Sequence, residues 1–189
     1  MKIMIINKFN ILSVGVGGQG VIRITQILAS AALKGNHHVR TAETHGMAQR
    51  GGSVSGYLRF GQHVEGPLIP SGQANIIMAF EPLEAVRNIK YAGKNTIIFL
   101  NNNKIIPLSI YQNKKLSYPK YEEIAKNLKK ITANVFYLDA TALAEKAGNA
   151  KTSNVIMLGV LIGTEVLPLS KENLEESIMK YVPEKAKKI

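Results

Sequence analysis

Two glycine-rich segments hold the residues of this chain that could do chemistry. The first is Gly15-Val16-Gly17-Gly18-Gln19-Gly20, which has the spacing G-x-G-x-x-G. Glycines permit positive φ angles and a close backbone approach, and the free amides that open a following helix favour an anionic group. These residues therefore indicate a nucleotide-binding loop. Tight packing of a strand on a helix, or the close approach of a partner's backbone, would explain the same glycines.

The second segment follows an expected strand and runs from Ala42 to Ser53. It sets an acid, an imidazole, an amide and a guanidinium among glycines, at Glu43, Thr44, His45, Gln49, Arg50, Gly51 and Gly52. Glu43 comes 23 residues after Gly20, close to the spacing at which dinucleotide-binding folds carry an acid for the ribose. The alternative interpretation is a hydrogen-bond network that only shapes the loop.

The elements that must position these segments alternate between strands and helices. Hydrophobic periodicity predicts strands at 9–14, 38–43, 54–60, 74–80, 96–100 and 135–138. It predicts helices at 19–34, 81–91, 121–130, 141–147, 154–164 and 174–181. This order is typical of an α/β, Rossmann-like three-layer fold with an open, mostly parallel sheet. Both glycine-rich segments should then lie side by side at the carboxyl edge of that sheet, where ligands bind.

Composition excludes several classes of function. The 189 residues contain no cysteine, so the chain offers no disulfide, no thiolate nucleophile and no cysteine ligand for an iron–sulfur cluster. The histidines show no metal-ligand spacing, so we expect no metal. The net charge of +11 could suit nucleic acid, but the lysines are interleaved with acids on polar helix faces. Solvated helix faces are the simpler interpretation, while an acidic partner or a polyanionic substrate stays open.

The sequence resembles the gamma-type subunits of 2-oxoacid:ferredoxin oxidoreductases, and among them those of the indolepyruvate type. The resemblance rests on the first glycine motif together with the run from Thr41 to Val54. It continues more weakly through Tyr118-Pro119, Leu138-Asp139-Ala140 and the run from Asn154 to Gly159. It covers nearly the whole chain, and it implies a single gamma-type domain over residues 1–189.

The resemblance implies an enzyme that oxidatively decarboxylates a 2-oxoacid, transfers the acyl group to coenzyme A and reduces ferredoxin. It favours an aryl 2-oxoacid such as indolepyruvate. Such enzymes use thiamine diphosphate and [4Fe-4S] clusters, which the resemblance places on a larger alpha subunit. Two copies of each subunit are expected. This chain alone would hold no cofactor and would have no turnover.

The resemblance also implies roles for the two segments. Gly15, Gly17, Gly18, Gln19 and Gly20 would form an amide-lined loop that faces the partner or coenzyme A. The second segment would complete the interface near the thiamine site. Within it, Arg50 could bind a carboxylate or phosphate bidentately, and His45 could relay a proton near neutral pH.

Two other functions remain as alternatives. A stand-alone NAD-dependent dehydrogenase would need its own nicotinamide pocket and catalytic residues. A nucleic-acid-binding module would rest on charge alone and would show an affinity that falls steeply with salt. No apolar run is long enough to span a membrane, so we expect no membrane segment and a cytoplasmic location.

Overall fold

The fold is built on one six-stranded sheet. The computed structural model describes residues 6–46, 51–112, 115 and 117–181. The strands are β1 (Phe9–Val16), β2 (His38–His45), β3 (Ser53–Gly61), β4 (Ala74–Ala79), β5 (Ala92–Asn101) and β6 (Val135–Leu138). Their order across the sheet is β2-β3-β1-β4-β5-β6, and β2 and β6 are its two edges.

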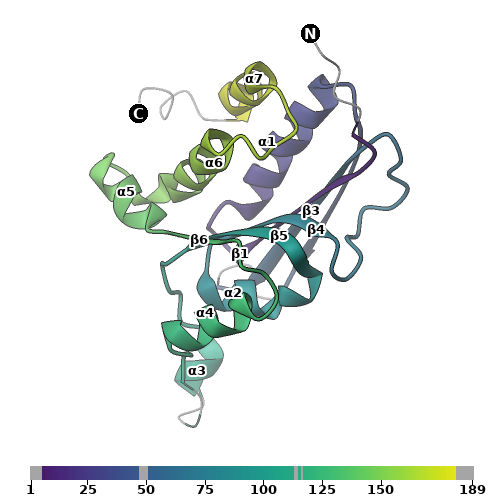
Figure 1. Cartoon of the computed structure of the whole chain (residues 1–189). Coiled ribbons are helices and arrows are strands. Elements are labelled where there is room, and N and C mark those ends of the chain that lie inside the picture. Colours follow the sequence, from purple (N-terminus) through teal and green to yellow (C-terminus); the bar gives the residue numbers. More distant parts are fainter. Residues whose placement is uncertain (1–5, 47–50, 113–114, 116, 182–189) are drawn as a thin grey trace.

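Helices cover both faces of the sheet (Figure 1). One face packs against α1 (Val21–Lys34), α6 (Ser153–Gly163) and α7 (Lys171–Tyr181). The other face packs against α2 (Pro82–Arg87) and α4 (Tyr121–Lys129). Helix α5 (Ala140–Lys146) lies beside α6. The expected α/β architecture with helices on both sides is therefore confirmed.

The apolar runs in the central strands follow from this sandwich. Along β1, Ile11 belongs to the core under α1, whereas Leu12 and Val14 belong to the core under α2 and α4. Successive side chains of a strand point to opposite faces, and here both faces are buried. The strand therefore shows a continuous apolar run, with no polar alternation.

Strand β3 runs against the other five. It pairs antiparallel with both β1 and β2, while β1–β4, β4–β5 and β5–β6 pair in parallel. The sheet is mostly parallel as expected, but β2 does not lie next to β1. Helix α1 crosses β3 closely at Gly56, where a Cβ atom would overlap the hydroxyl of Thr25.

The expected helix at 81–91 is shorter in the structure. Helix α2 ends at Arg87, where the side chain of Asn88 donates to the carbonyl of Glu84, and a single 3-10 turn follows at Ile89–Tyr91. Sequence periodicity missed two short elements, α3 (Leu108–Gln112) and the 3-10 turn Ala150–Thr152. Both are too short for an apolar repeat to be visible.

One buried cation joins the sheet to the connection after β3. Arg59 of β3 is 7% exposed, and its guanidinium donates to Oδ1 of Asn10 at 3.0 Å. It also donates to the carbonyl oxygens of Gly66 and Leu68, at 2.8 and 3.0 Å. These acceptors would lose their donor if the side chain became apolar.

We therefore expect Arg59→Met to lower the free energy of unfolding by about 2 kcal/mol. Urea denaturation of the purified chain measures this change. Arg40→Met is the matched control, because Arg40 is exposed on the edge strand and, among the described residues, donates to the carbonyl of Val39 alone. Its effect should stay within about 0.5 kcal/mol. Equal losses in the two variants would contradict the assigned role of Arg59.

Candidate functional site

The first glycine-rich segment forms the turn between β1 and α1. Gly18 has a φ angle of 102° and Gly20 one of 78°, values that disfavour residues with a side chain. Gly15 is needed for a different reason, since a Cβ atom there would lie 2.7 Å from Oε1 of Gln19. The glycines thus serve both the shape of the turn and its packing.

Gln19 fastens this turn to the sheet. Its Oε1 accepts from the backbone N–H of Val16 at 2.7 Å, and its Nε2 donates to the carbonyl of Phe80 at 2.9 Å. The side chain of Asn101 donates to the same carbonyl at 3.3 Å. The Gln19 amide therefore turns into the fold, and Gln19 does not line the adjacent cavity. Its contacts make it a positioning residue for the glycine turn.

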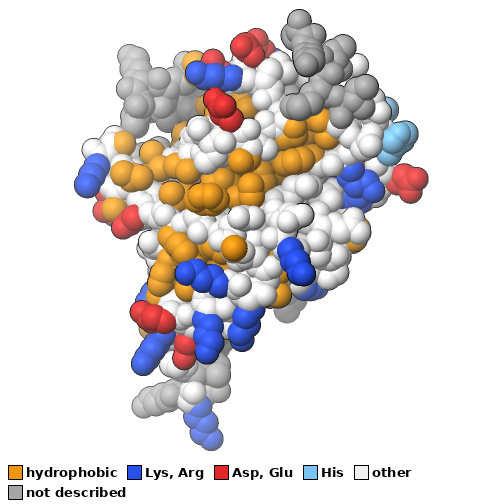
Figure 2. Space-filling model, in the orientation of Figure 1, with side chains coloured by type: hydrophobic (Ala, Val, Ile, Leu, Met, Phe, Trp, Pro, Cys, Tyr) orange, Lys and Arg blue, Asp and Glu red, His pale blue; other side chains and the backbone are white. Residues whose placement is uncertain are grey.

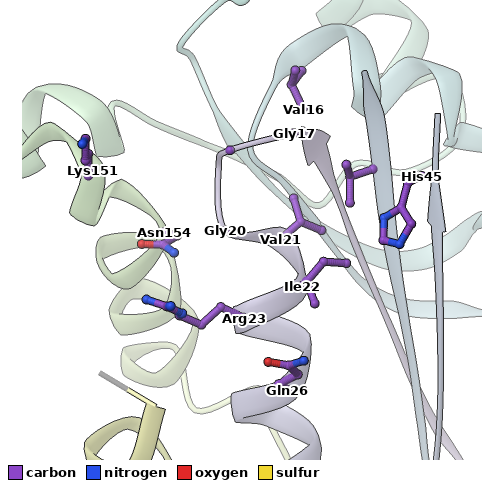
Figure 3. A pocket seen from close by; sticks show the side chains of 12 residues that line it. Val16, Gly17, Gly20, Val21, Ile22, Arg23, Gln26, His45, Lys151 and Asn154 are labelled. Carbon is purple, nitrogen blue, oxygen red and sulfur yellow. The ribbon is translucent and has the colours of Figure 1, made fainter. Parts of the chain in front are cut away.

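A cavity of about 560 Å³ opens beside the glycine turn (Figure 3). It is lined by Val16, Gly17, Gly18, Gly20, Val21, Ile22, Arg23, Gln26, His45, Val54, Lys151 and Asn154. These residues come from the β1–α1 turn, the first turns of α1, the facing ends of β2 and β3, the 3-10 turn Ala150–Thr152 and the start of α6. No Asp or Glu is among them.

The start of α1 has the electrostatic features of an anion-binding site. No side chain caps it, and its first turn carries no acidic residue. The backbone N–H groups of Val21, Ile22 and Arg23 belong to the part of a helix that has no intrahelical acceptor. The positive end of the helix dipole therefore faces the cavity, with the cationic Arg23 beside it. Such a site attracts phosphate or carboxylate groups.

Asn154 reaches the same cavity from the start of α6, and Lys151 reaches it from the 3-10 turn that precedes this helix. Asn154 is 7% exposed, and its Nδ2 lies so close to Gly20 that a Cβ atom there would overlap it. Oδ1 of Asn154 accepts from the backbone N–H of Val155, whereas Nδ2 has no acceptor among the described residues. Figure 3 shows this amide between α6 and the glycine turn. Because Asn154 lines the cavity, this amide is placed to donate to a ligand there.

The second glycine-rich segment meets the first, as the sequence predicts. The N–H of Gly17 donates to the carbonyl of Gly52, and the N–H of Gly46 donates to the carbonyl of Ser53, both at 2.9 Å. Gly51 has a φ angle of 79°. His45 lines the cavity. Gln49 and Arg50 lie outside the described residues.

Glu43 and Thr44 lie on the edge strand β2, where both are exposed. Glu43 is in register with Gly56 of β3, which is in register with Ser13 of β1. A whole strand thus separates Glu43 from β1, whereas a dinucleotide-binding fold places the second strand directly beside the first. Neither residue lines the cavity.

Sequence reasoning missed a buried acidic pair beneath this edge of the sheet. Glu81 caps α2 by accepting from the N–H of Glu84 at 3.0 Å, and the hydroxyl of Tyr118 also donates to it. Glu84 accepts from the hydroxyl of Ser53 and from Arg87, both at 2.5 Å. The pair thus anchors the end of the second glycine-rich segment to α2. The only signal in the sequence was Glu81-Pro82 at the expected helix start.

Burial raises the pKa of the Glu81 carboxyl above its usual value. A carboxyl with a raised pKa in the folded state contributes stability below its unfolded pKa, and this contribution is lost as pH rises through the folded pKa. Above the reference value of 4.5, the chain should therefore lose stability relative to Glu81→Gln. Urea denaturation of both proteins from acidic to neutral pH measures this difference.

The hydrogen bond from Tyr118 lowers the pKa of Glu81 and so opposes the effect of burial. Tyr118→Phe should therefore make the loss of stability with rising pH steeper. Parallel stability profiles for the native chain and Glu81→Gln would contradict the role of Glu81.

Among the described residues, no group of three or more histidine or acidic side chains could hold a metal ion. Within the same residues, no helix is long and apolar enough to cross a membrane. The donor-lined cavity is therefore the strongest candidate site in the part of the chain that the structure describes.

Comparison with known proteins links this geometry to one family. The family model described as "Pyruvate ferredoxin/flavodoxin oxidoreductase" matches residues 10–189. The chain is 44% identical, over 178 residues, to an indolepyruvate oxidoreductase subunit IorB from Archaeoglobus fulgidus. That match covers 94% of this chain and 88% of the relative.

Solved structures share the fold at low sequence identity. The gamma subunit of a keto/oxoacid ferredoxin oxidoreductase from Geobacter sulfurreducens superposes with a TM-score of 0.66 and 17% identity, over 94% of this chain and 88% of that one. A 2-oxoglutarate:ferredoxin oxidoreductase from Magnetococcus marinus gives the same TM-score and identity. There the match covers 93% of this chain and only 27% of the longer one.

Proposed function

The chain belongs to the pyruvate ferredoxin/flavodoxin oxidoreductase family as a small, gamma-type subunit, and from this membership we propose that its complex oxidises indolepyruvate or a related aryl 2-oxoacid. The substrate assignment is supported by the 44% identity to an indolepyruvate oxidoreductase subunit along 94% of the chain. The stand-alone NAD-dependent dehydrogenase is not supported by these relatives. The displacement of β2 from β1 also argues against a dinucleotide site.

The proposal divides the chemistry between two subunits. This chain has no cysteine, so it supplies no thiolate to an iron–sulfur cluster. We assign the clusters and thiamine diphosphate to a larger alpha subunit, with ferredoxin as the electron acceptor of the complex. The proposal includes two copies of each subunit, a cytoplasmic location, and one gamma-type domain over residues 1–189.

The cavity beside the glycine turn is proposed to bind the phosphate groups of coenzyme A. The observation that carries this assignment is a set of donors at the cavity that have no acceptor among the described residues: the first amides of α1, Nδ2 of Asn154, and the cations Arg23 and Lys151. A polyanion would satisfy them together. The glycine turn lets such a group approach the backbone closely.

The second glycine-rich segment is proposed to complete the site toward the large subunit. His45 lines the cavity and is proposed to relay a proton there. Arg50 is proposed to bind a carboxylate or phosphate group, and the neighbouring Glu43, Thr44, Gln49, Gly51 and Gly52 to shape this interface. Gln19 is proposed to act indirectly, by holding the glycine turn in place.

The proposed function is tested by anaerobic purification of the tagged chain from its native cells. The expected product is a brown complex with a larger, cysteine-rich subunit, which reduces a dye when given indolepyruvate and coenzyme A. Activity with a different 2-oxoacid would keep the subunit assignment and overturn the substrate. A colourless chain that binds NAD and has no partner-dependent activity would overturn both.

A further inference from the structure

Helix α6 is apolar on its outer face as well as on its inner face. Met157, Leu158 and Leu161 are fully buried against the core. On the opposite side Val155 is 36% exposed and both glycines of the helix are exposed. Ile156 and Val160 are half-buried and pack against the edge of the core. A helix that is hydrophobic all round is typical of a buried position. In the part of the chain that the structure describes, the core covers only one side of α6.

The two glycines of α6, Gly159 and Gly163, are not needed by this chain. A Cβ atom at either position would meet no atom within 4 Å, and neither residue has a positive φ angle. Gly15 and Gly20 differ, because a Cβ atom there would collide with neighbouring groups. Glycine inside a helix lowers its stability relative to alanine. The two residues are therefore best explained by something outside the chain that approaches this face closely.

The apolar surface continues beyond α6. Leu143 of the adjacent α5 is 46% exposed, and Phe136 of the edge strand β6 is 49% exposed. Phe136 stacks on Phe99, which places it on the α6 side of the sheet. Figure 2 shows hydrophobic side chains gathered in a band across the side of the molecule that carries α5 and α6. Contiguous apolar surface of this kind marks interaction sites.

We propose that this α6 face, made of Val155, Gly159, Gly163, Leu143 and Phe136, is where the large subunit of the complex docks. This inference rests on the proposed function. Asn154 lines the cavity from the first turn of the same helix, and Lys151 lines it from the 3-10 turn just before, so a subunit seated on α6 would border the cavity. The large subunit would then bring its reacting groups to the coenzyme A site.

Two observations favour the large subunit over a second copy of this chain. Each copy carries a net charge of +11, which opposes the association of identical chains. In the Magnetococcus marinus enzyme the same fold fills only 27% of a longer chain, so the fold also occurs as part of a larger covalent unit. Surfaces of the fold can be covered there by the rest of that chain.

The double variant Gly159→Ala/Gly163→Ala tests the proposal because its two expected effects have opposite signs. The isolated chain should melt at a temperature higher by about 4 °C, since alanine favours the helix and both methyl groups have room. The affinity for the large subunit should fall about tenfold or more, because the methyl groups would hold the partner's backbone away. Calorimetry of the chain and anaerobic titration of purified large subunit measure the two quantities.

Leu68→Ala is the matched control, because Leu68 is 58% exposed in the β3–β4 connection and should leave the affinity unchanged. Full affinity in the double variant, with a native chain that does bind the large subunit, would overturn the docking face alone. A native chain that binds no large subunit would overturn the proposed function instead. Self-association of the native chain that the double variant abolishes would assign the face to a second copy and overturn the proposal.

Discussion

Gly20→Ala is expected to reduce the coenzyme A-dependent activity of the complex to about one per cent or less of the native value. Two independent effects act at this position. Gly20 has a φ angle of 78°, which costs a residue with a side chain about 1–2 kcal/mol. The new methyl group would also overlap Nδ2 of Asn154 and push α6 away from the turn. The cavity would then lose both its shape and the Nδ2 donor of Asn154.

Gly18→Ala separates the two effects. Gly18 has a φ angle of 102°, but a Cβ atom there would meet no atom within 4 Å. Gly18→Ala should therefore lose about 1–2 kcal/mol of stability and keep most of the activity at saturating coenzyme A. Equal activity losses in the two variants would show that backbone strain alone matters, and the contact between Gly20 and Asn154 would then have no functional role. Dye-reduction assays with purified complex and urea denaturation of each chain measure both quantities.

The local part of the site was predictable from sequence because neighbouring residues specify it. The apolar run 9–14, the glycine turn and the amphipathic pattern 19–34 predict a strand, a turn and a helix start in that order. The structure has them at β1, Gly17–Gly20 and α1. The spacing of the glycines also indicated free amides, which depend only on the geometry of a helix start.

The distant part of the site was not predictable, because no sequence period encodes it. Asn154 lies 134 residues after Gly20 in the chain and meets it only after α6 has packed beside α1. The reversed direction of β3 was equally unpredictable, because the apolar pattern of a buried strand is the same whichever way the strand runs. The place of β3 between β1 and β2 separates Glu43 from β1. A spacing rule taken from parallel sheets therefore places Glu43 one strand too close to the glycine turn.

Charge reversal at Arg23 should separate binding from folding most clearly. The first turn of a helix favours an acid by about 0.3–1 kcal/mol, and Arg23 has no ion-pair partner among the described residues. Arg23→Glu should therefore leave the chain as stable as before, or slightly more stable. If the cavity holds the phosphates of coenzyme A, the same change removes a charge-assisted hydrogen bond and adds repulsion. The KM for coenzyme A should then rise by roughly 100-fold.

The kinetic pattern distinguishes this role from a general disturbance. The KM for the 2-oxoacid should hardly change if the cavity holds coenzyme A and the 2-oxoacid binds elsewhere. Arg40→Glu makes the same charge change on β2, where Arg40 is exposed and does not line the cavity, and should leave both KM values as they are. An unchanged KM for coenzyme A in Arg23→Glu would remove the phosphate group from this cavity. If a polyanion binds at the start of α1, the KM for coenzyme A must rise, because the negative charge of the polyanion would face the carboxylate that Arg23→Glu introduces.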